Sequence, residues 1–220
     1  GRNMSLSRRR EILRLCAEHD VPILEDGFNE ELRFRGECHP AIKALRGSEG
    51  VVYAGSFSKV LSPGIRVGYA IGPAALLKKM IVCKQGEDVH TAIWSQMLCE
   101  AFMTRCDYEA HLEYLRDLYR HKAERMIALI EEHLVPHGIT HHPIQGGLFV
   151  WCALPDGANM PEFCTKAVKE YKVAIVPGNA FLTDEKMPCQ AFRLNFSTPT
   201  DEDMRKGVER LGELAREFLK

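Results

Sequence analysis

The sequence has 220 residues, of which 45% are hydrophobic and 27% are charged, and its formal net charge is −1 at pH 7. This composition is typical of a globular protein and excludes a disordered chain. The near-zero net charge gives no support to nucleic-acid binding, and no apolar run approaches the roughly 20 residues that a membrane helix needs. No signal peptide is recognisable at the start, so we expect a cytoplasmic protein that contacts no membrane.

In chain order, the hydrophobic periodicity predicts six helices and six strands. Ser5 or Ser7 is expected to cap the first helix, and Thr200 or Asp201 the last one. The predicted helices cover residues 8–19, 73–83, 92–103, 108–134, 160–170 and 201–218, and the predicted strands cover 21–26, 51–55, 67–72, 147–152, 173–176 and 192–196.

Strands alternate with helices in the first part of the chain, which predicts an α/β fold with a mainly parallel sheet flanked by helices. The last part predicts a smaller α/β domain with helices on one face of its sheet. We therefore expect three parts: a large-domain part over 1–107, a long connecting helix over 108–135, and a small C-terminal domain over 136–220.

The eight cysteines include no Cys-x-x-Cys pair. The adjacent pairs Cys38-His39 and His141-His142 lack the ligand spacing of a zinc site. We therefore expect no metal site, and we expect free thiols in a reducing compartment.

The segment from Gly55 to Gly68 follows a predicted buried strand and brings Ser56, Ser58, Lys59 and Arg66 together within a dozen residues. A lysine beside hydroxyls and a guanidinium can form a Schiff base with an aldehyde cofactor whose phosphate needs anchoring. The alternative for a single Ser-Lys pair is a solvated lysine on a surface turn.

Two further charged residues lie in apolar strands. Asp26 ends a predicted buried strand, where a carboxylate is costly unless it is paired; its alternative role is to cap a turn near Gly27. Arg193 lies in Phe192–Phe196, and on an alternating strand it could simply face solvent.

The motif around Lys59 resembles the lysine-bearing motif of fold-type I aminotransferases, which use pyridoxal 5'-phosphate. The resemblance implies that Lys59 holds the cofactor aldehyde and moves the proton, and that Asp26 partners the ring nitrogen. It implies that Ser56, Ser58 and Arg66 hold the phosphate and that Arg193 binds the substrate α-carboxylate. The implied reaction is transamination between an amino acid and a 2-oxo acid in a homodimer.

The resemblance extends over essentially the whole chain and is closest to the branch of 2-aminoadipate and kynurenine aminotransferases. It implies that the chain is the C-terminal portion of such an enzyme: part of the large domain plus the small domain. Gly1 would be the last glycine of the family's Asn-Pro-x-Gly motif. The family's tyrosine near the cofactor ring oxygen is replaced here, with Asn29 or Phe28 at its position depending on the spacing.

Two other hypotheses stay open. Some transcriptional regulators join a winged helix-turn-helix to an aminotransferase-like domain that senses an effector, and the motifs around Asp26 and Lys59 fit those proteins too. A degenerate fragment without cofactor, working as a dimerising scaffold, is the third and weakest hypothesis. The sequence upstream of this chain would distinguish the aminotransferase from the transcriptional regulator.

Overall fold

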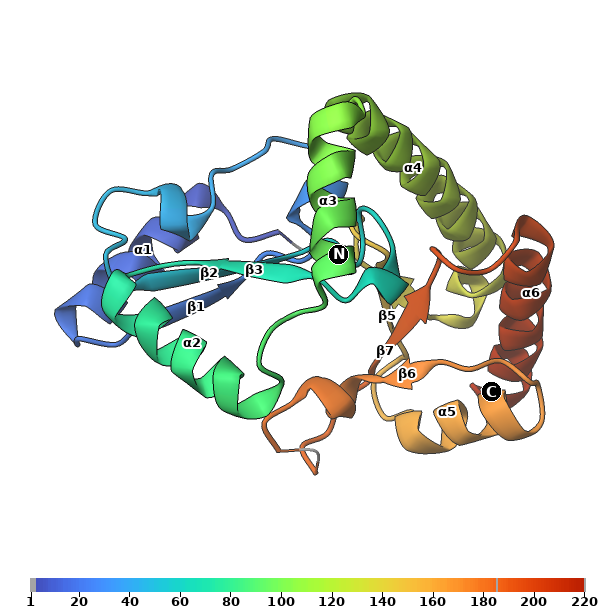
Figure 1. The fold of residues 1–220 in the computed structure, drawn as a ribbon. Helices are drawn as coiled ribbons and strands as arrows, with labels where there is room; N and C mark the ends of the chain where they lie inside the picture. The colour runs from blue at the N-terminus through green and yellow to red at the C-terminus, as the bar shows by residue number, and fades with distance from the viewer. Residues whose placement is uncertain (1–2, 185, 220) are drawn as a thin grey trace. The chain divides into compact units, whose positions relative to one another are not determined.

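The computed structural model describes residues 3–184 and 186–219 and has an α/β fold, as the sequence predicts (Figure 1). The described chain forms two compact units, 3–116 and 117–219. The predicted position of Gly1 in a glycine motif lies outside the described residues.

The first unit contains a three-stranded sheet in the order β1-β2-β3. Strands β1 and β2 are parallel, whereas β2 and β3 are antiparallel. Its helices and strands are α1 (Leu6–Glu18), β1 (Ile23–Asp26), β2 (Val51–Ser56), β3 (Gly68–Ile71), α2 (Ala74–Glu87), α3 (Ile93–Arg105) and the start of α4 (Tyr108–His133).

Helix α1 begins at Leu6, two residues before the predicted start. Of the two predicted caps it uses Ser5, whose hydroxyl accepts a hydrogen bond from the backbone N–H of Arg8. This cap satisfies one of the N–H groups that the first helical turn leaves without a partner. Leu13 then packs with Ile42 and Val51 in a small apolar core. Helix α1 therefore packs on one face of the sheet, at β1 and β2.

The carboxylate of Glu25 holds the segment that follows β1. Its two oxygens accept hydrogen bonds from the backbone N–H groups of Ile42 (2.7 Å) and Lys43 (2.9 Å), at the start of a 3-10 turn. The Glu25 side chain is only 13% exposed, and the Arg9 guanidinium lies 3.9 Å away. Glu25 thus supplies the turn with a partly buried, charge-assisted cap.

Helices α2 and α3 are apolar on more than one side. Among the described residues, α2 has no buried residue and α3 has only Cys99. A helix that is apolar all round is normally buried in a larger core. The exposed apolar residues on the two helices are Leu76, Met80, Ile81, Val82, Ile93, Trp94, Met97, Leu98 and Met103.

The second unit contains an antiparallel four-stranded sheet in the order β4-β5-β7-β6. Helices α5 and α6 lie on the same side of this sheet (Figure 1). Besides the end of α4, its elements are β4 (Thr140–His141), β5 (Phe149–Ala153), α5 (Met160–Lys169), β6 (Val176–Pro177), β7 (Ala191–Asn195) and α6 (Asp201–Phe218).

The core of the second unit forms because its strands alternate. In β7, Phe192 and Leu194 are buried, whereas Arg193 between them is only partly buried. The Phe192 ring packs 5.7 Å from the ring of Phe163 on α5, centroid to centroid. Burial also raises the pKa of the Cys152 thiol to about 12, so this core cysteine stays protonated and acts as a small apolar group.

Two short strands differ from the sequence prediction. The prediction of a strand over 173–176 is wrong for its first three residues, since β6 begins only at Val176. Strand β4 was not predicted. Lys172 adopts a left-handed conformation with φ 59°, and the backbone N–H of Val173 donates to the Ala167 carbonyl at 2.8 Å. Val173 therefore satisfies the end of α5 instead of joining the sheet.

We expect Glu25→Gln to lower the free energy of unfolding of the full-length protein by about 1–3 kcal/mol, because an amide NH₂ would face a backbone N–H that now has an acceptor. The midpoint of urea unfolding measures this change. Glu18→Gln is the control: Glu18 is half exposed and pairs with Arg14 on the surface, so its loss should cost less than about 1 kcal/mol. Equal effects of the two substitutions would show that Glu25 does not hold the turn.

Candidate active site

Asp26 and Lys59 lie after neighbouring parallel strands. Asp26 is the last residue of β1 and is aligned with Ala54 of β2, and Lys59 follows in the turn after β2 ends at Ser56. Because β1 and β2 are parallel, both strands end at the same edge of the sheet, which is where α/β proteins bind ligands. The Asp26 side chain is exposed and Lys59 is half-buried; within the described part of the chain, neither side chain has a hydrogen-bond or ion-pair partner.

The strand alternation also decides which face of the sheet Asp26 occupies. Glu25 points to the side of the 3-10 turn and α1, so Asp26 points to the opposite side. Ala54 is directly opposite Asp26, and Ser56 is two residues further along β2, which places Ser56 on the same face as Asp26. This face is open beside β1, where Leu24 is 71% exposed.

Ser56, Ser58 and Arg66 form a connected cluster after β2. The Ser56 hydroxyl accepts from the backbone N–H of Ser58 at 3.1 Å, and Arg66 Nη1 donates to the Ser58 hydroxyl at 3.2 Å. Arg66 Nη1 also donates to the Pro63 carbonyl, and Arg66 has a left-handed backbone with φ 52°. Among the described residues no carboxylate pairs with Arg66, so its charge is available to an anion such as a phosphate.

The turn that carries Lys59 is held at both ends. The backbone N–H of Phe57 donates to the Val67 carbonyl at 3.0 Å, and that of Leu61 donates to the Phe57 carbonyl at 2.8 Å. From α4, the ring Nε2 of His111 donates to the carbonyl of Val60 at 2.7 Å. The backbone of Val60, the residue after Lys59, is therefore held by a side chain that lies 51 residues further along the chain.

Glycines allow the strands behind this turn to approach one another. A Cβ on Gly68 would lie 2.9 Å from the carbonyl oxygen of Gly55, and a Cβ on Gly55 would overlap the Tyr69 ring. The Tyr69 ring instead packs 5.8 Å from the ring of Phe57, centroid to centroid. Replacement of Gly68 would force β2 and β3 apart just before the Ser56–Arg66 cluster, whereas replacement of Gly55 would displace the Tyr69 ring.

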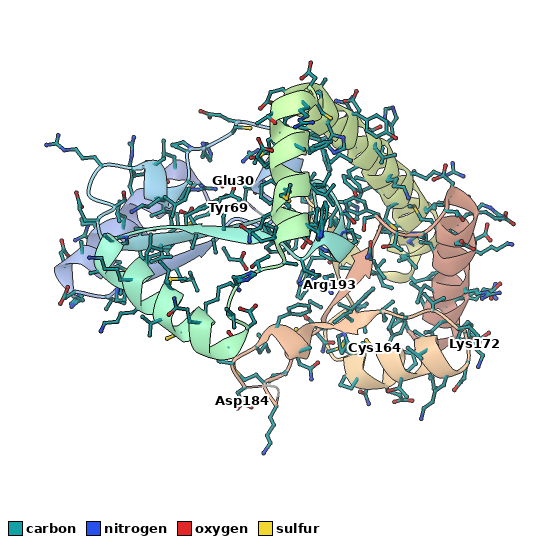
Figure 2. The ribbon with its side chains drawn as sticks, viewed as in Figure 1. Glu30, Tyr69, Cys164, Lys172, Asp184 and Arg193 are labelled. Atoms are coloured by element: carbon teal, nitrogen blue, oxygen red, sulfur yellow. The ribbon has the colours of Figure 1, made fainter. Side chains whose placement is uncertain are left out.

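A second polar group lies on the α1 side of the same sheet. The Tyr53 hydroxyl donates to the Glu30 carboxylate at 3.0 Å; Figure 2 labels Glu30 and Tyr69 in this part of the molecule. Burial and the neighbouring Glu30 charge raise the pKa of the Tyr53 phenol well above its usual value. This tyrosine is thus held as a neutral hydrogen-bond donor.

Of the two candidates for the replaced family tyrosine, Phe28 is exposed, while Asn29 has a buried side-chain oxygen without a hydrogen-bond partner in the described chain.

Arg193 lies in the second unit, on β7 (Figure 2). Its Cζ atom lies 4.1 Å from the ring centroid of Phe149 and 4.9 Å from that of Phe181. No carboxylate of the described residues pairs with it. The sequence did not predict these aromatic contacts; the only available signal was the alternation of Phe149 and Trp151, which places both on the face that carries Arg193.

Within residues 3–184 and 186–219, no group of three or more histidine, cysteine, aspartate or glutamate side chains is arranged to hold a metal ion. Over the same residues, no helix combines the length and apolar character needed to cross a membrane.

The family model of class I and II aminotransferases matches residues 1–211. The chain belongs to this aminotransferase family. It is 33% identical over 220 residues to aromatic-amino-acid aminotransferase 1 of Thermococcus litoralis, a match that covers 100% of this chain and 52% of that protein. It is 35% identical over 217 residues to 2-aminoadipate transaminase of Thermus thermophilus, a match that covers 97% of this chain and 54% of that protein. The resemblance proposed from the motifs is thus confirmed.

Solved structures of the family have the same fold. The structure of Pyrococcus horikoshii kynurenine aminotransferase in complex with PMP superposes with a TM-score of 0.93 at 34% identity, covering 100% of this chain and 54% of that one. This chain therefore spans about half the length of the aminotransferases that it matches. A Bacillus subtilis protein described as an uncharacterized HTH-type transcriptional regulator is also similar, at 31% identity over 98% of this chain and 44% of that protein.

We expect inorganic phosphate to stabilise the cofactor-free full-length protein through Arg66. At ten to a hundred times the dissociation constant, the gain should be about 1–3 kcal/mol, read from the urea midpoint in phosphate and in chloride of equal ionic strength. Phosphate also stabilises proteins by exclusion from their surface, and this general part should remain in Arg66→Ala.

The matched control for this measurement is Arg46→Ala, which removes an exposed arginine of the same unit. It should respond to phosphate as the unsubstituted protein does. If Arg66→Ala shows the same gain in phosphate as Arg46→Ala, the Ser58–Arg66 cluster does not bind phosphate.

Proposed function

We propose that the complete protein catalyses pyridoxal 5'-phosphate-dependent transamination between an amino acid and a 2-oxo acid, and that this chain is its C-terminal half. The observation that carries the proposal is the pairing of β1 with β2, which brings Asp26 and Lys59 to one sheet edge next to the Ser56–Ser58–Arg66 cluster. Membership of the aminotransferase family supports the same conclusion.

The residues present suit this cofactor in their chemistry. The Arg66 guanidinium and the two serine hydroxyls match a phosphate group, which accepts several charge-assisted hydrogen bonds. The Asp26 carboxylate, free of partners within the described residues, suits a protonated ring nitrogen, and the Lys59 amine suits an aldehyde. We assign these five residues to cofactor binding and Lys59 also to catalysis.

Each residue would have a distinct task. When bound, the cofactor's protonated ring supplies an electron sink for the carbanion that develops at the substrate Cα. Asp26 keeps the proton on the ring nitrogen by opposing its positive charge. Lys59 would take the proton from the substrate Cα as a general base and would then deliver it, as a general acid, to the carbon that comes from the cofactor aldehyde. Arg193 binds the α-carboxylate of the amino acid and so limits the orientations in which its Cα can react.

The exposed apolar residues of α2 and α3 support a larger assembly. In the complete protein we propose that they are covered by the N-terminal half of the polypeptide and by the second subunit of a homodimer. We also propose a cytoplasmic location and keep the division into 1–107, 108–135 and 136–220 for the domains of the complete protein.

The second candidate function is that of an effector-sensing domain in a winged-helix transcriptional regulator. The similarity to a Bacillus subtilis HTH-type regulator supports it. Aminotransferases and these regulators share the half of the protein that this chain represents. A winged helix-turn-helix encoded upstream, together with binding of the full-length protein to DNA and no turnover of amino acids, would favour the regulator.

We expect Lys59→Ala to abolish the visible absorption of the full-length protein loaded with pyridoxal 5'-phosphate, because no other amine of the site takes the place of Lys59. Absorption spectroscopy after gel filtration measures this directly. Lys206→Ala, which removes an exposed lysine paired with Glu202 on α6, should keep the absorption and serves as the control. A full-length protein that stays colourless at saturating cofactor would overturn the proposed function.

We expect Arg193→Ala to raise the apparent KM for amino donors by roughly thirty-fold or more, since loss of a charge-assisted carboxylate contact costs about 2–5 kcal/mol. Retention of the cofactor should change little. Arg205→Ala is the control, because Arg205 pairs with Glu209 on the surface of α6. Steady-state kinetics and the cofactor absorption together test the role, and equal losses of substrate binding and cofactor binding would argue against it.

A further inference from the structure

Arg193 lies on the side of the four-stranded sheet that faces away from α5 and α6. Its neighbours in the sheet are Trp151 on β5 and Val176 on β6, which are its register partners and therefore share its face. Phe149, two residues before Trp151, lies on this face as well. Arg193 is thus the charged residue in a patch made mainly of aromatic and aliphatic side chains.

The guanidinium is in contact with two aromatic rings. Its Cζ atom lies over the Phe149 ring at 4.1 Å and over the Phe181 ring at 4.9 Å, both well inside the distance of about 6 Å at which a cation is attracted to a ring. The ring of Trp151 meets that of Phe181 edge to face, with centroids 5.3 Å apart. We call Phe149, Trp151 and Phe181 the aromatic cage.

The chain conformation around Gly178 holds Phe181 over Arg193. Phe181 ends the short 3-10 turn Gly178–Phe181, and a Cβ on Gly178 would lie 2.5 Å from the carbonyl oxygen of Ala191 on β7. Only a residue without a side chain lets this turn approach β7 so closely. The close approach of this turn to β7 therefore positions Phe181.

The environment of Arg193 differs from that of the structural arginines in this chain. Arg9 lies near Glu25 and Glu30, and Arg116 lies near Glu31 and Glu113. Arg193 has no carboxylate among the described residues, so its position is fixed while its charge is left uncompensated.

We propose that Phe149 and Phe181 are positioning residues for Arg193: they hold its guanidinium by cation–π contact and keep its full charge for the carboxylate of a ligand. This inference rests on the proposed function, in which that ligand is the amino acid or the 2-oxo acid. A carboxylate of the protein in the same place would hold the arginine equally well but would compete with the ligand. Two rings fix the guanidinium without this competition and reduce the entropy lost on binding.

The proposal is tested in the full-length enzyme loaded with its cofactor, using Phe181→Leu and Phe149→Leu. Each change removes a ring but keeps an apolar side chain of similar volume. We expect a rise of about two- to thirty-fold in the KM for the amino donor and in the inhibition constant of propionate, a carboxylate without an amino group, with kcat within about two-fold of the unsubstituted enzyme. The cofactor absorption should not change.

Two further variants make the readout specific. Phe181→Tyr and Phe149→Tyr keep the ring face and should bind propionate nearly as the unsubstituted enzyme does. Phe218→Leu removes a ring that lies 5.3 Å from the Lys166 ammonium, away from Arg193, and should leave both constants unchanged. Phe181 is 50% exposed, so its substitution should leave the fold intact even if Phe149→Leu does not fold.

The outcomes separate this inference from the proposed function. If Arg193→Ala weakens propionate binding but Phe181→Leu behaves as Phe218→Leu does, the aromatic cage has no positioning role and the inference fails alone. A parallel fall of kcat, cofactor absorption and propionate binding in Phe181→Leu would also overturn it, because that pattern indicates general disruption. If Arg193→Ala itself leaves propionate binding and KM unchanged, the carboxylate role in the proposed function fails first.

Discussion

The parallel pairing of β1 with β2 is the constraint on which the candidate site depends. Asp26 and Lys59 are 33 residues apart in the chain, and only the alignment of Asp26 with Ala54 brings the two strand ends to one edge. The pairing is itself supported from the other face, where Glu25 caps the 3-10 turn and Leu13 packs on Val51. One residue of β1 thus stabilises the fold, and the next one is left free for chemistry.

The arginines of this chain divide according to their partners. Arg9 and Arg116 lie beside glutamates and connect segments of the first unit. Arg66 is held by a serine hydroxyl and a backbone carbonyl, and Arg193 by two phenyl rings. Neutral groups can fix a guanidinium without cancelling its charge, and this distinction separates arginines that support the fold from those that suit an anionic ligand.

The fold class and the family motif around Lys59 could be predicted from the sequence. Ser5 and Thr200 cap the first and last helices as expected, and the helical periodicity placed α4 within one residue of its observed end. The prediction was poorer where a hydrogen bond at a helix end decides the outcome, as for Val173, whose backbone N–H donates to the Ala167 carbonyl of α5. The rings around Arg193 could not be foreseen, because they depend on cross-strand register and on a turn that only the missing side chain of Gly178 permits.

The apolar surfaces of α2 and α3 have a practical meaning for work with this polypeptide. Leucine, valine, isoleucine, methionine and tryptophan side chains are exposed along these two consecutive helices, and such an apolar surface favours association of the isolated segment in water. Such a segment is not an autonomous module that can be moved between proteins or expressed without its neighbours and still behave well. These two helices therefore mark where further protein surface has to pack to keep such a segment soluble.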